Sequence, residues 1–389
     1  MTDTNELELS VVMPCLNEAD TVVICVTKAL KAMAESGIAG EVVVADNGST
    51  DGSQDLAVRA GARVVPVVEK GYGNALMGGI ASARGKYVLM GDADDSYDFL
   101  ELPKFVARLR EGYDLVQGCR LPAGGGRIRE GAMPWSHRWI GNPMFSFFAR
   151  RWFRAPIHDI YCGMRGFSKA LYQRLDQRCT GMEFATEMII KSSLYQERIA
   201  EVPITLHKDG RVAHPPHLKT VRDGWRTLRF FLLYSPRWLF LYPGLALVLL
   251  GLLGTALALP AVSFRGVVFD VHTLLYSCFS ILLGVQGMTF AVFTKVFAVN
   301  EGLVPPHAGL ARFFNWMTLE RGVFIGLLLF AAGLGLLGYW FTYWAETGFG
   351  RLEYPYTLRR VIPGALLTSL GLQVVLASFF TGILGMKRK

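Results

Sequence analysis

The chain has 389 residues, enough for two domains, and 51% of them are hydrophobic while only 19% are charged. This balance is too apolar for an ordinary soluble protein and indicates a membrane part. The net charge of +8 does not favour nucleic-acid binding, because much of it lies between Arg120 and Arg237, just ahead of the most apolar part. A basic face toward anionic lipid headgroups fits better. The six cysteines lack the short paired spacing of a zinc site or a disulfide framework.

Residues 7–123 alternate short apolar runs with segments of helical spacing, which is typical of a parallel α/β sheet. The predicted strands are Leu9–Met13, Val42–Ala45, Arg63–Val67, Tyr87–Met90 and Leu115–Gly118. The predicted helical stretches between them are 18–35, 51–60, 73–83 and 101–111. Ligands of such sheets gather beyond the carboxyl ends of the strands. We therefore expect one cleft to hold the polar residues that follow the first, second and fourth strands.

The fourth of these strands lies in the segment 86–96, where an apolar run stops at Asp92, Ala93, Asp94 and Asp95. Three carboxylates at a strand end repel one another unless a cation lies among them, and hard oxygen ligands select Mg²⁺ or Mn²⁺. An acidic turn that caps the next helix is the alternative interpretation. The Asp-x-Asp spacing predicts a divalent metal on Asp92 and Asp94.

Two further polar segments come earlier in the chain. Pro14-Cys-Leu-Asn17-Glu18 follows the first strand, and Asp46-Asn47-Gly-Ser-Thr-Asp51 follows the second. Seen alone, the second segment is an ordinary turn that leads into a helix. In this order, and together with the Asp-x-Asp, the segments resemble the family 2 glycosyltransferases, whose α/β catalytic domain has the GT-A nucleotide-sugar-binding fold. The resemblance covers residues 8–205.

The resemblance implies a donor site for a UDP- or GDP-sugar. In it, Asp46 would accept the imide N–H of a uracil or guanine ring, and the metal on Asp92 and Asp94 would receive the charge of the leaving diphosphate. Arg211 belongs to a basic stretch, 207–217, expected near the diphosphate. The nucleotide-sugar-binding residues implied are Pro14, Asn17, Glu18, Asp46, Asn47, Asp92 and Arg211.

The acceptor side is expected around residues 134–154, which pair aromatic bulk with a cationic edge as interfacial amphipathic helices do. A buried amphipathic helix is the alternative. Upstream, Gln117-Gly-Cys-Arg120 ends the fifth strand, and similar positions in polyprenyl- and dolichyl-phosphate hexose synthases supply an arginine to the acceptor phosphate. We expect Arg120, Arg138 and Asn142 to contact this phosphate.

Downstream, Asp159-Ile-Tyr-Cys-Gly-Met-Arg165 resembles an Asp-x-x-Ser-Gly-Phe-Arg element of the same transferases. It implies that Asp159 lies on the sugar or acceptor side, while an ion pair with Arg165 is an equal alternative. Glu183 begins a predicted helix and could bind sugar hydroxyls or act as a base. The catalytic residues expected are Asp94, Arg120, Arg138 and Asp159.

Beyond residue 220 the composition shifts toward a membrane part. We expect a cytosolic GT-A domain at 1–220, a basic aromatic juxtamembrane helix at 221–237 and an all-α membrane domain at 238–389. Four apolar spans, each long enough to cross a bilayer, are 238–262, 272–298, 322–344 and 361–385. Four crossings would return the chain to its starting side. Lys387–Lys389 agrees with a cytosolic end, whereas Arg359 and Arg360 would lie outside, against the positive-inside tendency.

These expectations combine into one function, the inverting transfer of a hexose, glucose or mannose first in line, to a polyprenyl phosphate such as an undecaprenyl carrier. A phosphate monoester is already a nucleophile, so no strong general base is needed. Two alternatives stay open: a glycosyltransferase for a lipid or polysaccharide hydroxyl, and a non-catalytic lipid-carrier adaptor or flippase subunit. The expected location is a bacterial inner or plasma membrane with the catalytic domain in the cytosol. Membrane lipids would be partners, nucleic acid would not, and any homo-oligomer would form through the membrane helices.

Overall fold

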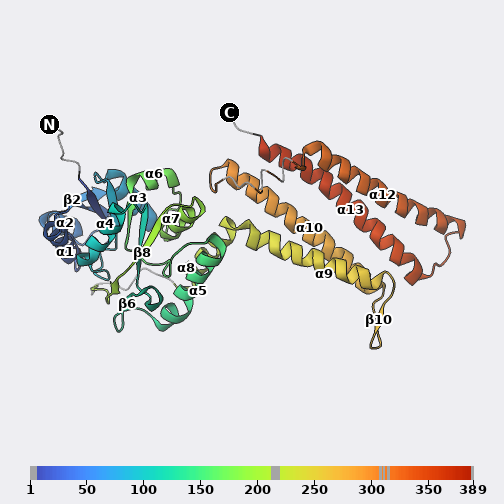
Figure 1. Cartoon of the computed structure of the whole chain (residues 1–389), viewed down its shortest axis with the longest axis horizontal. Helices are drawn as coiled ribbons and strands as arrows, with labels where there is room; N and C mark the ends of the chain where they lie inside the picture. The colour runs from blue at the N-terminus through green and yellow to red at the C-terminus, as the bar shows by residue number, and fades with distance from the viewer. Residues whose placement is uncertain (1–6, 212–219, 306–308, 310–311, 313–315, 387–389) are drawn as a thin grey trace. The chain divides into compact units, whose positions relative to one another are not determined.

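The computed structural model describes residues 7–211, 220–305, 309, 312 and 316–386. It divides the chain into two compact units, Met1–Phe231 and Leu232–Lys389. The first is an α/β domain and the second is helical (Figure 1). Residues 212–217 of the expected basic stretch and Lys387–Lys389 lie outside the described residues.

The described part of the first unit contains a seven-stranded sheet in the order β3-β2-β1-β4-β7-β5-β8. All five predicted strands are confirmed, as β1 (Leu9–Cys15), β2 (Gly40–Asp46), β3 (Arg63–Pro66), β4 (Tyr87–Met90) and β5 (Leu115–Cys119). In the register of β1 with β2, Cys15 lies opposite Asp46, and β4 pairs with the other side of β1. The polar segments after these three strands therefore meet at one edge of the sheet.

The predicted strands that pair with one another do so in parallel, as expected, and the sheet also contains one antiparallel strand that the sequence did not predict. β7 (Arg165–Ser168) runs antiparallel between β4 and β5, with Arg165 opposite Met90 and Gln117. Its sequence, Arg-Gly-Phe-Ser, has no apolar alternation, so no local pattern marks it as a strand. β8 (Ile199–Pro203) pairs in parallel with β5, and a small second sheet joins β6 (Arg127–Ile128) to β9 (Thr205–Leu206).

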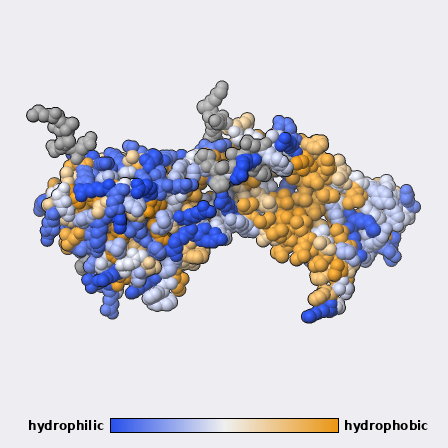
Figure 2. Space-filling view, in the orientation of Figure 1, coloured by the Kyte–Doolittle hydropathy of each residue, from blue (hydrophilic) through white to orange (hydrophobic). Residues whose placement is uncertain are grey.

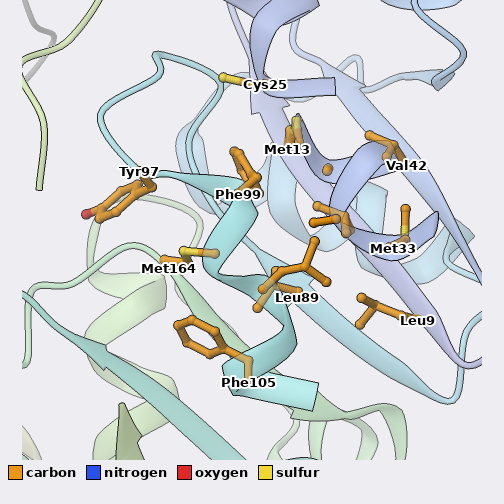
Figure 3. Close-up of a cluster of buried hydrophobic side chains, with 14 of the residues drawn as sticks. Leu9, Met13, Cys25, Met33, Val42, Leu89, Tyr97, Phe99, Phe105 and Met164 are labelled. Atoms are coloured by element: carbon orange, nitrogen blue, oxygen red, sulfur yellow. The ribbon is translucent and has the colours of Figure 1, made fainter. Parts of the chain in front are cut away.

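An apolar core fixes the strand ends. Leu9, Met13 and Leu89 of the sheet gather with Met33 of α1 and Phe105 of α4 (Figure 3), and all five are buried. Helices of this unit are α1 (Val22–Glu35), α2 (Ser53–Arg59), α3 (Tyr72–Ser82), α4 (Leu102–Arg110), α5 (Asn142–Phe153), α6 (Lys169–Leu175), α7 (Glu183–Leu194) and the first part of α8 (Thr220–Tyr234). Short 3-10 turns are η1 (Phe99–Glu101) and η2 (Pro122–Gly124).

The segment 134–154 folds as a π-helical turn, η3 (His137–Gly141), that leads into α5. Pro143 stands in the first turn of α5, and because proline has no N–H and its ring crowds the preceding turn, the helix opens there. The segment is two-faced. Its buried side packs Phe145 and Phe153 edge-on against Phe231 of α8. Its other side exposes Trp135, Trp139, Ile140, Met144 and Phe147.

The second unit contains, among its described residues, four helices long and apolar enough to cross a membrane, which confirms the expected spans. They are η4 (Arg237–Leu241) with α9 (Tyr242–Ala258), then α10 (Val271–Asn300), α12 (Leu319–Glu346) and α13 (Tyr354–Gly385). A short hairpin, β10 (Ser263–Phe264) and β11 (Val267–Val268), joins the first two. Apolar side chains cover much of the visible face of these helices (Figure 2). The expected juxtamembrane helix corresponds to α8, which ends at Tyr234, so that Arg237 belongs to the next helix.

Glycines bring these helices into close contact. A Cβ added to Gly326 of α12 would lie 2.7 Å from Val375 Cγ2 and 2.9 Å from Gly371 O, both on α13. Where hydrocarbon surrounds the helices, such small residues allow backbone approach and dispersion contacts. Arg359 of α13 forms an ion pair with Asp270 at 2.7 Å.

Gly326→Leu should therefore destabilise the helical unit, because the new side chain must displace the α13 backbone, at a cost of about 1–3 kcal/mol. Gly335→Leu is the matched control on the same helix, since nothing lies within 4 Å of a Cβ there. Thermal unfolding of the detergent-solubilised chain should show a lower Tm for the first variant alone. Equal Tm values for the two variants would contradict this packing.

Candidate active site

The loops after β1 and β2 are bound to each other. Asn17 adopts a left-handed conformation with φ of 60°, and its Oδ1 accepts a hydrogen bond from the Thr50 N–H at 2.9 Å. The Asn17 N–H donates to Ser49 Oγ and the Glu18 N–H donates to Ser53 Oγ, each at 2.9 Å. The two segments expected to line a nucleotide are thus held as one wall.

Asp46 and Asn47 brace this wall. The buried carboxylate of Asp46 accepts hydrogen bonds from the Gly48 N–H at 3.0 Å and from Gln54 Nε2 at 2.6 Å. The Asn47 side chain holds the loop before α3, because Nδ2 donates to Glu69 O at 2.7 Å and Oδ1 accepts from the Gly71 N–H at 2.9 Å. Asn47 therefore shapes the pocket through its neighbours rather than presenting a free amide.

Asp92 and Asp94 come from the end of β4. Asp94 Oδ1 accepts two hydrogen bonds from Ser96, from its N–H at 3.0 Å and from its hydroxyl at 2.6 Å, which orients the carboxylate. Asp92 Oδ1 accepts a hydrogen bond from the Tyr72 hydroxyl at 2.9 Å. The third carboxylate of the expected trio is elsewhere, since Asp95 pairs with Lys28 at 2.8 Å.

The remaining pair is electrostatically strained. Burial and the charge of Asp94 raise the pKa of Asp92 to about 7, against the hydrogen bond from Tyr72 and the charge of Arg211. Two hard carboxylates in this state fit a divalent cation, which would offset their repulsion. Among the described residues no group of three or more His, Cys, Asp or Glu side chains could hold a metal ion. A metal here would take its other ligands from diphosphate oxygens and water.

Arg211 lies beside this pair. Its guanidinium contacts Glu18 Oε1 at 2.6 Å and Asp94 Oδ2 at 3.2 Å. The structure thus brings together the predicted residues Glu18, Asp92, Asp94 and Arg211, which come from three distant parts of the sequence. A cation next to two carboxylates is well placed to bind an anionic diphosphate.

On the other side of the carboxylate pair, Arg120 is buried in a forked ion pair. Its Nε donates to Asp159 Oδ2 at 2.7 Å and its Nη2 to Asp159 Oδ1 at 2.9 Å. The alternative pairing of Asp159 with Arg165 is wrong, because Arg165 donates to the carbonyl oxygens of Cys162 and Ala185. Asp159 is fully buried, so its carboxylate is committed to holding Arg120.

Tyr97 links Arg120 to the carboxylate pair. Its hydroxyl accepts hydrogen bonds from Arg120 Nη1 at 3.4 Å and from the Gly163 N–H at 2.8 Å. A Cβ on Gly163 would lie 2.8 Å from Asp92 Oδ2 and 3.1 Å from the Tyr97 hydroxyl. Arg120 and Asp92 are therefore neighbours across Tyr97 and Gly163.

Glu201 holds the backbone around Asp159 in place. Glu201 of β8 accepts hydrogen bonds from the backbone N–H groups of His158 at 2.7 Å and Asp159 at 3.1 Å, and it pairs with His158 Nδ1 at 2.8 Å.

Burial and the nearby charge of Arg120 lower the pKa of His137.

The other predicted acceptor residues lie on η3 and α5. Arg138 stacks over the Trp139 ring with 5.3 Å to its centroid, and its buried Nε has no hydrogen-bond partner within the described part of the chain. Asn142 is buried, with Nδ2 3.4 Å from Met133 Sδ. Glu183 stands apart from this group and faces Arg226 of α8 at 3.9 Å.

Sequence reasoning missed Tyr72, Tyr97, His137 and Glu201. Each acts through a partner that is distant in the sequence or in another loop, so no motif marks it. The one local signal is the position of Tyr97, five residues after Asp92, where a buried aromatic is unexpected beside an acidic turn.

Asp92→Asn should raise the Tm of the metal-free protein at pH 8 by roughly 5 °C. The carboxyl of Asp92 ionises less readily in the folded state than in the unfolded chain. Its ionisation therefore lowers the free energy of unfolding, and this loss is absent below about pH 4 and complete above about pH 7. The gain should fade as the pH is lowered toward 5. With excess Mg²⁺ and nucleoside diphosphate the wild type should have the higher Tm, because only the wild type keeps both carboxylates for the metal and is stabilised by binding it. A Tm of Asp92→Asn below that of the wild type in excess chelator would contradict the inference that the two carboxylates destabilise the metal-free protein.

Comparison with known proteins identifies the family. The glycosyl transferase family 2 model matches residues 10–176, and the glycosyltransferase family 2 C-terminal transmembrane region matches 292–385. A low-salt glycan biosynthesis hexosyltransferase of Haloferax volcanii is 38% identical over 383 residues, which is 97% of this chain and 89% of that protein. A dolichyl-phosphate hexose transferase of the same organism is 34% identical over 42% of this chain and 68% of its own length.

Among solved structures, glucosyl-3-phosphoglycerate synthase from Mycobacterium tuberculosis, in complex with Mg²⁺ and uridine-diphosphate, is 22% identical with a TM-score of 0.47. The match covers 58% of this chain and 78% of that one. The similarity to a hexosyltransferase over nearly the whole chain and the matches to two family models agree with the sequence motifs. This chain is therefore a member of glycosyltransferase family 2 that carries the family's C-terminal transmembrane region.

Proposed function

We propose that this glycosyltransferase transfers a hexose from a UDP- or GDP-sugar to the phosphate of a polyprenyl carrier, with inversion at the anomeric carbon. The observation that carries the proposal is that Arg120 and Asp92 lie on either side of Tyr97 and Gly163. It sets a cation beside the carboxylate pair in a chain with four apolar helices. The names of the two relatives support a hexose as the transferred sugar and a lipid phosphate as the acceptor. We propose glucose or mannose as the hexose.

The donor half of the site would hold the nucleotide sugar. We assign the base to the wall formed by Pro14, Asn17 and Asp46, and the diphosphate to the neighbourhood of Arg211 and Glu18. Asp92 and Asp94 would hold Mg²⁺ or Mn²⁺, which when bound stabilises the negative charge that develops on the diphosphate. Asn47 supports this pocket by fixing the loop before α3.

The acceptor half would hold the lipid phosphate. Arg138 Nε has no partner among the residues that the structure describes, and Arg120 Nη1 lies outside the fork with Asp159, at the Tyr97 hydroxyl. With Asn142 close by on α5, these groups suit a phosphate oxygen. The exposed aromatic side of η3 and α5, with Trp135 and Trp139, would lie in the headgroup region of the membrane.

The chemistry follows from the acceptor's charge. A phosphate monoester carries roughly −1.5 to −2 charges at neutral pH, so its oxygen attacks without a general base. The bond from that oxygen to the anomeric carbon forms as the bond from this carbon to the diphosphate oxygen breaks, and no proton must move. Attack from behind inverts the anomeric centre. Asp94 and Arg211 serve the leaving side, while Asp159 positions Arg120 and is not a base.

We place the catalytic unit in the cytosol and the helices in the plasma membrane. An even number of spans returns the chain to its starting side, which agrees with a catalytic unit and a C-terminal end on one face. Asp270 neutralises Arg359, which removes the conflict between this topology and the positive-inside tendency.

The direct test is incubation of the purified full-length protein with polyprenyl phosphate, Mg²⁺ or Mn²⁺ and a panel of UDP- and GDP-sugars. We expect a hexosyl polyprenyl phosphate of inverted configuration, identified by mass spectrometry of the lipid and by NMR of its anomeric centre. Transfer to lipid hydroxyls alone would favour the hydroxyl-acceptor alternative. Absence of transfer from every sugar would favour the non-catalytic one.

Asp94→Asn should lower kcat by roughly 100-fold or more, because the metal loses a ligand that Ser96 orients. Asp95→Asn is the matched control, since Asp95 faces Lys28 instead. Turnover should also stop in excess chelator. Equal losses in the two variants would contradict the assignment of the metal to Asp92 and Asp94.

Arg138→Ala should raise the KM for polyprenyl phosphate by roughly 10-fold or more while leaving the KM for the nucleotide sugar within a factor of two, because a charge-assisted contact is lost on one substrate only. Arg151→Ala, on the exposed part of α5, provides the control. Initial rates measured against each substrate separate the two constants. An equal rise in both would count against the acceptor assignment.

A further inference from the structure

One end of the helical unit carries two cations that have no acidic partner among the described residues. Arg237 begins η4, and Lys295 lies five residues before the end of α10. Arg237 is exposed and Lys295 is half-buried. Neither forms a salt bridge or a hydrogen bond with another described residue, whereas Arg359 at the other end of α10 is paired with Asp270.

The packing of η4 and α9 on α10 brings these two side chains together. Gly251 approaches Ser277 and Ile281, and Gly244 approaches Gly284 and Met288. The two helices thus run antiparallel, and each step toward the start of α9 is matched by a step toward the end of α10.

The same register continues into η4. The Phe240 ring lies 6.0 Å from the Phe290 ring, and a Cβ on Gly287 would lie 3.4 Å from Phe240 O. Arg237, one turn before Phe240, therefore stands level with the last turns of α10 that contain Lys295.

Two adjacent cations next to apolar helix surfaces are costly unless an anion joins them. The depth of the pair in a bilayer is marked by Trp238, whose ring packs 4.9 Å from the Tyr242 ring. Such aromatic pairs favour the boundary between hydrocarbon and headgroups. At this depth the abundant anions are lipid phosphates.

The local structure repeats a feature of the catalytic unit. Arg138-Trp139 lies in the π turn η3 ahead of Pro143, and Arg237-Trp238 lies in the π turn η4 ahead of Pro243. Each turn carries an arginine next to a tryptophan. The second site stands on its own contacts, so it does not depend on the role assigned to Arg138.

We propose that Arg237 and Lys295 form a binding site for the phosphate group of a membrane lipid, between η4 and the last turns of α10. Arg237 approaches the phosphate from the aqueous side, and Lys295 extends its amine from the helix toward the same group. The phosphate belongs to a headgroup or to a polyprenyl phosphate, and the two have the same chemistry at this site. This site lies in the helical unit and is additional to glycosyl transfer.

The test measures lipid retention by the full-length protein without any nucleotide sugar. Protein is incorporated into nanodiscs of phosphatidylcholine doped with either phosphatidylglycerol or polyprenyl phosphate, then extracted, and the retained lipids are counted by native mass spectrometry. The variant is R237Q/K295Q. The matched control is R265Q/R351Q, which removes two exposed cations from the same unit.

We expect the first variant to retain roughly 10-fold less of the doped anionic lipid, phosphatidylglycerol or polyprenyl phosphate, than wild type, since each of the two cations attracts an anionic lipid. The control should retain the wild-type amount. Loss of phosphatidylglycerol identifies a headgroup site, and loss of polyprenyl phosphate alone identifies a carrier site. Unchanged retention in R237Q/K295Q, or equal loss in the control, overturns the proposal.

Folding is checked by R237K/K295R, which keeps both charges and should retain lipid as the wild type does. Loss of lipid from this conservative variant would also overturn the proposal. Because no sugar donor is present, failure of this test leaves the glycosyl-transfer assay unaffected, and the two results are separable.

Discussion

The repulsion between Asp92 and Asp94 is the constraint around which the catalytic unit is arranged. The core beneath β4 holds the two carboxylates close together, and burial raises the pKa of Asp92 to about 7. Tyr72, Ser96 and Arg211 reduce the conflict by hydrogen bonding and by charge, whereas the nearby carboxylate of Glu18 adds to it. An active site that is destabilised when empty gains most when a cation and its diphosphate bind, which is a common compromise between stability and function.

The acceptor side solves the opposite electrostatic problem. A buried arginine needs an anion, and Asp159 supplies it through a two-point fork that also fixes the guanidinium plane. Glu201 holds the backbone that carries Asp159, so the orientation of Arg120 depends on a residue of β8. Tyr97 and Gly163 lie between the two halves, because the Tyr97 hydroxyl accepts hydrogen bonds from Arg120 and from the Gly163 N–H, and Gly163 packs close to Asp92.

The helical unit depends on close backbone approach. Apolar side chains alone give no preference for one helix neighbour over another in hydrocarbon, whereas glycines at Gly326 and Gly371 allow specific contact. A hydrogen bond of 2.5 Å from Gln373 to Gln286 joins α13 to α10, and the Asp270–Arg359 pair joins α13 to the start of α10. Arg237 and Lys295, at the opposite end of α10 from Asp270, form the proposed site for a lipid phosphate.

The sequence by itself determined the strands β1 to β5, the polar segments at their ends, the apolar spans and the family, because these depend on local pattern and on motif order. The tertiary structure decided which charges meet. Asp95 pairs with Lys28, and Asp159 pairs with Arg120 rather than with Arg165, which is nearer in the sequence. Electrostatic attraction falls with distance in space, and only the folded chain sets that distance for residues far apart in sequence.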